Sequence, residues 1–203
     1  MSTLFVNNLS TASGTNITLA SGKQLDATAG TFVPPAGHIV QIVTHRHGDM
    51  PQHNTTSFVE LSSNYRATIT PKYANSKILI NATVNINPAC AVNTIFLWKL
   101  MRSTAGGSFA DLADVTDGNT GNRHAISSGG STRRGNGHDT NDMNPIQWNA
   151  IDTPNTTSAV TYSPYFKQES SGTNIIYIGH SASNQNDWGS HSFYQATIME
   201  IKV

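Results

Sequence analysis

Two neighbouring stretches decide the fold class of this chain: Lys77-Ile-Leu-Ile-Asn-Ala-Thr-Val-Asn-Ile and Thr94-Ile-Phe-Leu-Trp-Lys-Leu-Met-Arg. The first is the longest clean strand pattern in the sequence, and the second follows it after a short gap. From Ile80 onwards the first stretch alternates apolar and polar side chains, which is the two-residue period of a β-strand with one buried face. Both stretches therefore predict strands.

Further stretches with strand patterns lie on both sides of this pair, separated by clusters of turn-forming residues. No window of about a dozen residues shows the 3.6-residue period of an amphipathic helix with a cap at each end. About eight strands separated by turns are typical of a β-sandwich or barrel. The sequence therefore predicts an all-β fold, an antiparallel β-sandwich of jelly-roll-like form. The other strands are expected at 38–43, 57–61, 65–70, 145–151, 160–167, 174–179 and 192–203.

Residues 1–37 have the pattern of an extended appendage. Leu4 and Val6 recur at a two-residue spacing, and so do Ile17 and Leu19, but each run is too short and too polar to close a core. The appendage ends at Pro-Pro-Ala-Gly, which is typical of a stiff linker followed by a break. Such apolar stripes need a partner surface, most simply other copies of the chain in a closed ring. We therefore expect an attachment and oligomerisation segment at 1–37, a sandwich domain at 38–203, and a homotrimer.

The composition excludes several classes of partner. The 203 residues include 12 basic and 12 acidic side chains, so the formal net charge is zero. Only 12% of the residues are charged, against about a quarter in an average domain. Without a basic excess we expect neither nucleic acid nor an anionic lipid surface as a partner. No apolar run approaches the roughly 20 residues of a membrane span and no secretory signal opens the chain, so we expect synthesis in the cytoplasm and no membrane insertion.

Two polar segments interrupt the strand pattern. Residues 103–144 are dominated by Gly, Ser, Thr, Asn, Asp, His and Arg, and a loop this long in a compact domain is usually functional or disordered. A second polar segment, 180–191, contains a tryptophan. Aromatic faces stack on sugar rings while amides and guanidinium groups reach the hydroxyls, so such loops are typical of glycan binding. The candidate receptor-binding residues are Arg133, Arg134, His138, Trp188 and His191.

Some of these candidates have a plainer interpretation. Arg133 and Arg134 could meet acidic glycans or lipopolysaccharide phosphates, or they could form a solvated pair in a flexible loop. Trp188 could stack on a ligand or on a neighbouring subunit. Trp98 and Trp148, by contrast, fall within strand patterns, and we expect both to pack in the core.

The sequence His45-Arg-His47 is a candidate metal site. Residues two apart in a strand point to the same side, so both imidazoles can meet one centre. Three copies around a threefold axis would supply six nitrogens, an octahedral set for a transition-metal ion. The plainer interpretation is a pair of solvated histidines at a strand end, next to a turn at 48–51.

Several carboxylates in the segment 103–144 offer the pair that a glycosidase needs. They lie in a sequence of turn composition, where Asp is expected to cap backbone groups. A hydrolase also needs a rigid scaffold that holds two carboxylates at a fixed separation. We therefore expect no enzymatic activity. The carboxylates are Asp111, Asp114, Asp117, Asp139 and Asp142.

The opening Met-Ser-Thr-Leu-Phe-Val-Asn-Asn-Leu-Ser-Thr-Ala-Ser-Gly-Thr resembles virion proteins of marine bacteriophages, notably cyanophages and pelagiphages. Such proteins are commonly described as tail fibre or fibre-like structural proteins. The resemblance covers both ends and most strand stretches, but not 103–144. It implies a virion component with a β-rich, trimeric C-terminal domain, and it brings no catalytic residues. The other motifs that carry it are Ser-Phe-Val-Glu-Leu (57–61), Ile-Thr-Pro-Lys-Tyr-Ala-Asn-Ser-Lys-Ile-Leu-Ile (69–80), Asp-Thr-Pro-Asn-Thr-Thr-Ser-Ala-Val-Thr-Tyr (152–162) and Ala-Thr-Ile-Met-Glu-Ile (196–201).

The sequence thus predicts a structural virion protein of a bacteriophage, a homotrimeric tail fibre or spike. Residues 1–37 would attach it to another virion protein, and its loops would contact a host surface glycan. One alternative is a capsid decoration protein with the same fold and no receptor. A more distant alternative is a glycan-degrading enzyme. We expect no cofactor, and a transition-metal ion on the threefold axis is the one candidate.

Overall fold

The computed structural model describes residues 21–22, 33–89, 94–112, 130–134, 143–169, 175–182 and 190–203, and at 89, 94 and 130–134 it describes the backbone. The chain divides into two compact units, Met1–Val33 and Pro34–Val203, whereas the sequence predicted a boundary between residues 37 and 38. All the strands of the described residues lie in the second unit. Within the described residues no helix is long and apolar enough to cross a membrane.

The first sheet, sheet A, centres on the long strand β5. β12 and β11 pair one after the other along one edge of β5, and β9 pairs along its other edge. β1 and β2 continue the sheet beyond β12 and β11, so that β1, β12, β5 and β9 lie side by side in this order. The strands are β1 (Ile39–His47), β2 (Gln52–His53), β5 (Lys77–Ala89), β9 (Asn144–Asp152), β11 (Ile175–Ile178) and β12 (Tyr194–Ile201).

The second sheet, sheet B, is built around the neighbouring strands β10 and β6. β3 and β4 pair with the free edge of β10, while β7 and β8 pair with the free edge of β6. A short 3-10 helix, η1 (Ser63–Tyr65), lies between β3 and β4. The strands are β3 (Val59–Glu60), β4 (Ala67–Ile69), β6 (Thr94–Thr104), β7 (Ala110–Asp111), β8 (Gly130–Arg134) and β10 (Val160–Gln168).

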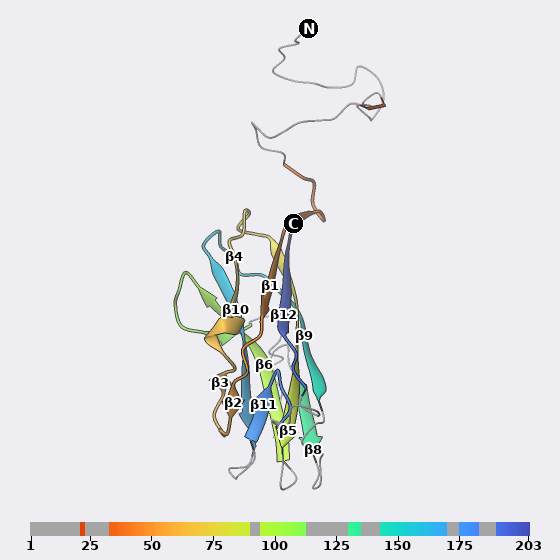
Figure 1. Cartoon of the computed structure of the whole chain (residues 1–203). Helices are drawn as coiled ribbons and strands as arrows, with labels where there is room; N and C mark the ends of the chain where they lie inside the picture. The colour runs from red at the N-terminus through yellow and green to blue at the C-terminus, as the bar shows by residue number, and fades with distance from the viewer. Residues whose placement is uncertain are drawn as a thin grey trace, which may run out of the picture. The chain divides into compact units, whose positions relative to one another are not determined.

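The order of the strands is that of a jelly roll. Every pairing in both sheets is antiparallel, and the chain passes repeatedly from one sheet to the other: β1 to β4, β4 to β5, β5 to β6, β8 to β9, β9 to β10 and β10 to β12. Two such sheets face each other in a jelly-roll sandwich. The predicted all-β antiparallel sandwich is therefore confirmed, and Figure 1 shows its strands.

The segment 103–144 differs from the prediction of one long loop. β6 extends into it as far as Thr104, and both β7 and β8 lie inside it. These strands were not predicted because β7 has two residues and the β8 sequence, Gly-Ser-Thr-Arg-Arg, shows no apolar alternation. Both pair with β6, a strand that the sequence predicted well.

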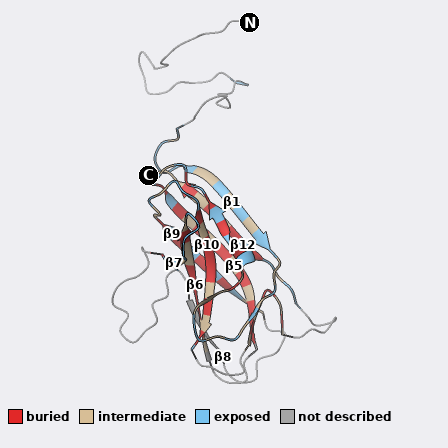
Figure 2. Cartoon of the chain, turned by 90° about the vertical axis from the view of Figure 1, so that its left-hand side faces the viewer, coloured by how far each residue is buried: buried red, intermediate tan, exposed pale blue. Residues whose placement is uncertain are grey.

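The core lies between the sheets and follows from the alternation in the strands. In β9, Ile146, Trp148 and Ala150 are buried while their neighbours are exposed, and Figure 2 shows such stripes along the sheets. The rings of Tyr65 and Tyr194 stack across the core at 4.5 Å. Trp148 is fully buried and Trp98 is 8% exposed, which confirms that both tryptophans pack in the core.

A polar network ties the two sheets together inside the core. The carboxylate of Asp152 on β9 accepts two hydrogen bonds from Arg102 Nη1 on β6, at 2.7 and 2.9 Å. It also accepts one from the Tyr162 hydroxyl on β10, at 2.7 Å. Burial raises the pKa of Tyr162, and the neighbouring Asp152 carboxylate raises it further, so the hydroxyl remains a donor.

A second buried carboxylate, Glu200 on β12, fixes the turn between β4 and β5. Its oxygens accept hydrogen bonds from the backbone N–H groups of Lys72 and Tyr73 at 2.8 and 3.1 Å and from Ser76 Oγ at 2.7 Å. Gln41 Nε2 on β1 donates to the other oxygen at 2.6 Å. These bonds replace the water that a buried carboxylate loses.

Candidate interaction surface

The outer face of sheet A is formed by the strand residues that alternate with the core residues. The pairing register aligns these side chains in rows across β1, β12, β5 and β9. We call this surface face A. It consists of Ile42, Thr44 and Arg46 on β1, Gln195, Thr197 and Met199 on β12, Leu79, Asn81 and Thr83 on β5, and Gln147, Asn149 and Ile151 on β9.

One row of face A is entirely apolar. Ile42 lies opposite Met199, Met199 opposite Leu79, and Leu79 opposite Ile151. The two ends of this row are well exposed, since Ile42 retains 56% and Ile151 54% of their accessible surface. Side chains in one row of a sheet pack against each other, so they form a continuous apolar stripe.

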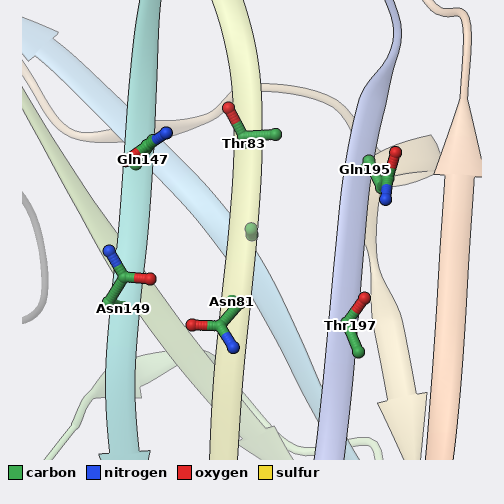
Figure 3. A pocket seen from close by; sticks show the side chains of 7 residues that line it. Asn81, Thr83, Gln147, Asn149, Gln195 and Thr197 are labelled. Atoms are coloured by element: carbon green, nitrogen blue, oxygen red, sulfur yellow. The ribbon is translucent and has the colours of Figure 1, made fainter.

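The next two rows carry amides and hydroxyls. Figure 3 shows them around a depression of about 210 Å³ lined by Asn81, Ala82, Thr83, Gln147, Asn149, Gln195 and Thr197. Gln147 and Asn149 come from β9, Thr83 and Asn81 from β5, and Gln195 and Thr197 from β12. Each of these groups donates and accepts hydrogen bonds. The lining holds no titratable side chain, so it suits binding and not acid–base chemistry.

An aromatic and a cationic side chain border the polar rows. The Arg46 guanidinium lies 3.9 Å from the centre of the Phe193 ring, which is 45% exposed. The His191 ring lies 5.1 Å from the same ring. An arginine over an aromatic face is a favourable cation–π arrangement.

The outer face of sheet B, called face B, differs in its charges. Arg66 donates two hydrogen bonds to the Glu60 carboxylate at 2.7 and 2.8 Å, and Ser163 Oγ donates a third at 2.6 Å. Burial raises the pKa of Glu60, but the bonds from Arg66 and Ser163 outweigh burial and hold the pKa below its ordinary value. Lys99 Nζ pairs with Asp111 at 2.6 Å.

Aromatic rings also cover part of face B. Lys99 Nζ lies 4.3 Å from the centre of the Phe58 ring, and Lys167 Nζ lies 5.2 Å from it. The Phe109 ring packs at 5.6 Å against that of Tyr165. Charged and aromatic groups on face B thus find partners within the same chain.

The predicted metal ligands lie on the side of β1 opposite to Ile42 and Arg46. His45 Nε2 donates to the carbonyl of Asn64 at 2.7 Å, and its ring lies 6.1 Å from that of Tyr194 in the core. His47 Nδ1 accepts a hydrogen bond from the Asp49 N–H at 3.0 Å. Among the described residues, no group of three or more His, Cys, Asp or Glu side chains could hold a metal ion. A site with ligands from several copies stays a prediction.

The predicted receptor-binding residues are not brought together in the described part of the chain. Arg133 and Arg134 lie in strand β8, where the backbone alone is described. His138 and Trp188 lie outside the described residues. His191 is exposed and forms an isolated bridge with His180, next to Phe193.

Among the described residues, the carboxylates that were candidates for a hydrolase form no pair with each other. Asp111 on β7 forms the ion pair with Lys99, and the others lie outside the described residues. The carboxylates outside the described part are Asp114, Asp117, Asp139 and Asp142.

The sequence contained a signal for face A that was not interpreted as a site. Asn81 and Thr83, Gln147 and Asn149, and Gln195 and Thr197 each occupy alternate positions of a predicted strand. An outward amide in one strand is common, but three strands repeating the pattern indicate a shared surface. The register that aligns them was needed to see it.

Comparisons with known proteins find similarity only to solved structures, and only at low identity. No family model matches the chain, and no curated protein matches it. Three similar solved structures come from infectious bursal disease virus: the Gx strain and the VP2 subviral particle, each with a TM-score of 0.38 and 10% identity, and T=1 particles, with 0.35 and 8%. The alignments cover 91% of this chain and 46%, 46% and 41% of those chains, so this chain spans less than half their length.

Proposed function

We propose that this protein is a structural component of a bacteriophage virion, a trimeric fibre or spike that contacts the host surface. Residues 1–37 attach it to another virion protein, and the sandwich carries the loops that meet the host. The sequence resemblance to fibre-like proteins of marine phages motivates the proposal. The difference between the two ends of the sandwich supports it.

The two ends of the sandwich differ in what they carry. At one end the chain enters beside the last strand, since Gly37 N–H donates to the carbonyl of Lys202 at 2.8 Å. Lys202 N–H in turn donates to the carbonyl of His38 at 3.0 Å, and Figure 1 shows the C-terminus at this end. A segment that precedes Pro34 therefore joins the sandwich at this end.

The opposite end carries several connections between strands. The register places Ala89 opposite Ile175, Thr94 opposite Arg134, Phe96 opposite Gln168 and Ile86 opposite Asn144 there. Residues 90–93, 135–143 and 169–174 connect these strand ends. Attachment at one end and several connecting segments at the other is an arrangement suited to a receptor-binding module.

A capsid decoration protein is the second candidate, because a sandwich that is attached at one end also suits attachment to a capsid. The proposal includes no enzymatic activity, since the polar depression on face A is lined by amides and hydroxyls and by no carboxylate. An ion shared by His45 and His47 of several copies stays a prediction, and elemental analysis of purified protein would detect it.

Labelled antibodies imaged on intact particles test the location. We expect labels at the tail, and we expect the purified sandwich to compete with phage for adsorption to cells. Removing residues 137–141, between β8 and β9, should leave the protein folded while it reduces this competition. Labels on the capsid, together with undiminished adsorption in the presence of the protein, would identify a decoration protein instead.

A further inference from the structure

We propose that face A is covered by face A of other copies of this chain, and that face B remains exposed in the assembly. The proposed function enters only through the number of copies, which it sets at three. Exposed apolar side chains gather on face A, its strand residues include no acidic group, and its size suits a contact between copies.

Exposed apolar side chains concentrate on sheet A. Ile42 and Ile151 end the apolar row, and Phe193 lies on the same surface with 45% exposure. Ile39, which is 53% exposed, lies opposite Ile201 and extends the apolar surface towards the end of the sandwich where the chain enters. The large hydrophobic residues that are exposed in the described part of the chain include none on the strands of sheet B. Single exposed apolar residues are ordinary, whereas a contiguous group marks an interaction surface.

The charges on face A select a copy of itself as the partner. Its side chains include Arg46 but no acidic group, and the neighbouring Lys77 stands at the end of β5. An acidic partner would find only these two cations, far apart along the strands. Asn, Gln and Thr side chains both donate and accept hydrogen bonds, so a row of them can pair with an identical row. Apart from Arg46, the amide, hydroxyl and apolar side chains of face A can therefore meet the same side chains of other copies without repulsion.

The dimensions of face A also fit a contact between two protein surfaces. Four strands spaced about 4.8 Å apart, and four rows about 6.8 Å apart once the Ile39–Ile201 row is counted, give a flat area near 500 Å². Side-chain relief raises the accessible area towards the roughly 800 Å² that each partner contributes to a standard interface. The apolar row would form the dry centre of the contact, with the amide rows beside it.

Sedimentation velocity of the full-length chain over a range of concentrations tests the proposal. We expect the wild-type protein to sediment as a multimer, and Ile42→Lys with Ile151→Lys to sediment as a single chain of 21.8 kDa with an unchanged circular dichroism spectrum. Thr68→Lys is the control, because Thr68 is an exposed residue of β4 on face B. It should keep the wild-type mass. A wild-type monomer, or a double variant of wild-type mass, would overturn the proposal.

A second, nearly isosteric variant tests the same contact with less risk of misfolding. Asn149→Asp with Gln147→Glu adds negative charges to exposed positions of β9 without changing their shape. Like charges brought together at a contact weaken association, so we expect a dissociation constant raised at least about tenfold and partly restored by salt. Unchanged, salt-independent association would also overturn the proposal. Because these measurements use purified protein, a virion location other than the tail leaves their result unaffected.

Discussion

Face A and face B belong to two sheets with the same architecture, yet their outward residues differ in kind. On face B, Glu60 is paired with Arg66, Lys99 with Asp111, and Phe58 lies against two lysines. On face A, an apolar row and two amide rows stand open. Inward residues of both sheets serve the one core, so the difference between the faces reflects what each meets outside. Face B pairs its charged groups within the chain. On face A, Thr83 Oγ1 donates to the Ile146 carbonyl at 3.1 Å and Arg46 lies over Phe193, but the apolar row and the amides are open to a partner.

The largest effect on stability is expected from a change that weakens the contact between the two sheets. Asp152→Ala removes the acceptor of Arg102 and Tyr162, and leaves a partly buried guanidinium without its carboxylate. Breaking such a pair costs about 3 kcal/mol, which urea denaturation would measure as a lower free energy of unfolding. Asp152→Leu combined with Arg102→Met should cost less, since no charge remains unpaired. A loss below about 1 kcal/mol for Asp152→Ala would show that this network does not hold the sheets together.

A smaller loss of stability is expected at Glu200 on β12, the strand between β1 and β5. Glu200→Gln replaces one carboxylate oxygen by an NH₂ group, and in either orientation this group faces a donor: Gln41 Nε2, or Ser76 Oγ and the N–H groups of Lys72 and Tyr73. One hydrogen bond is lost and two donors oppose each other, so we expect unfolding to become easier by about 1–2 kcal/mol. Thermal denaturation followed by circular dichroism would measure it. No shift of the midpoint would mean that the turn between β4 and β5 is held by other contacts.

The ion pair of face B should contribute little, because Arg66 retains 46% of its side-chain exposure. Glu60→Gln is expected to lower the free energy of unfolding by at most about 1 kcal/mol. The same variant should leave the sedimenting mass unchanged, because it alters face B and not face A. If Glu60→Gln dissociated the assembly, face B and not face A would be the contact between copies.

The smallest effect concerns pH. A hydrogen bond from Ser62 Oγ, with a further one from Asn64, lowers the pKa of Asp49 below the value of 3.8 despite its partial burial. The folded state therefore favours the carboxylate, and this stabilisation is present above the unfolded pKa and lost as the pH falls through the lower folded pKa. We expect it to disappear below about pH 4. Asp49→Asn should reduce the acid dependence of unfolding in that range, and an identical pH profile would refute the assignment.

The alternation of residues was enough to predict the sandwich and much of its core. The pattern around Ile80 placed the centre of sheet A, and the positions of Trp98 and Trp148 in strand patterns predicted their burial. The same reasoning placed His45 and His47 on one side of a strand, but it did not say which side faces the core.

Face A could not be predicted from the sequence, because it depends on the pairing register between strands. Asn81 lies beside Asn149 and Thr197 only after three strands that are distant in the sequence pair with one another. A shift of one residue in any pairing would move these amides to the core side. The short strands β7 and β8 were missed for a related reason, since pairing with β6 defines them more than their own residues do.

Oxidation of two methionines in the unmodified protein tests most directly whether the faces differ as described. Met199 lies on face A and Met101 on face B, each partly exposed on the outer side of a sheet, while Met50 is 49% exposed and serves as a reference. In the assembled protein we expect Met199 to react several-fold more slowly with hydrogen peroxide than Met101, and dilution into single chains should remove the difference. Equal oxidation of Met199 and Met101 in the assembled protein, or protection of Met101 instead, would contradict the assignment of face A as the contact between copies.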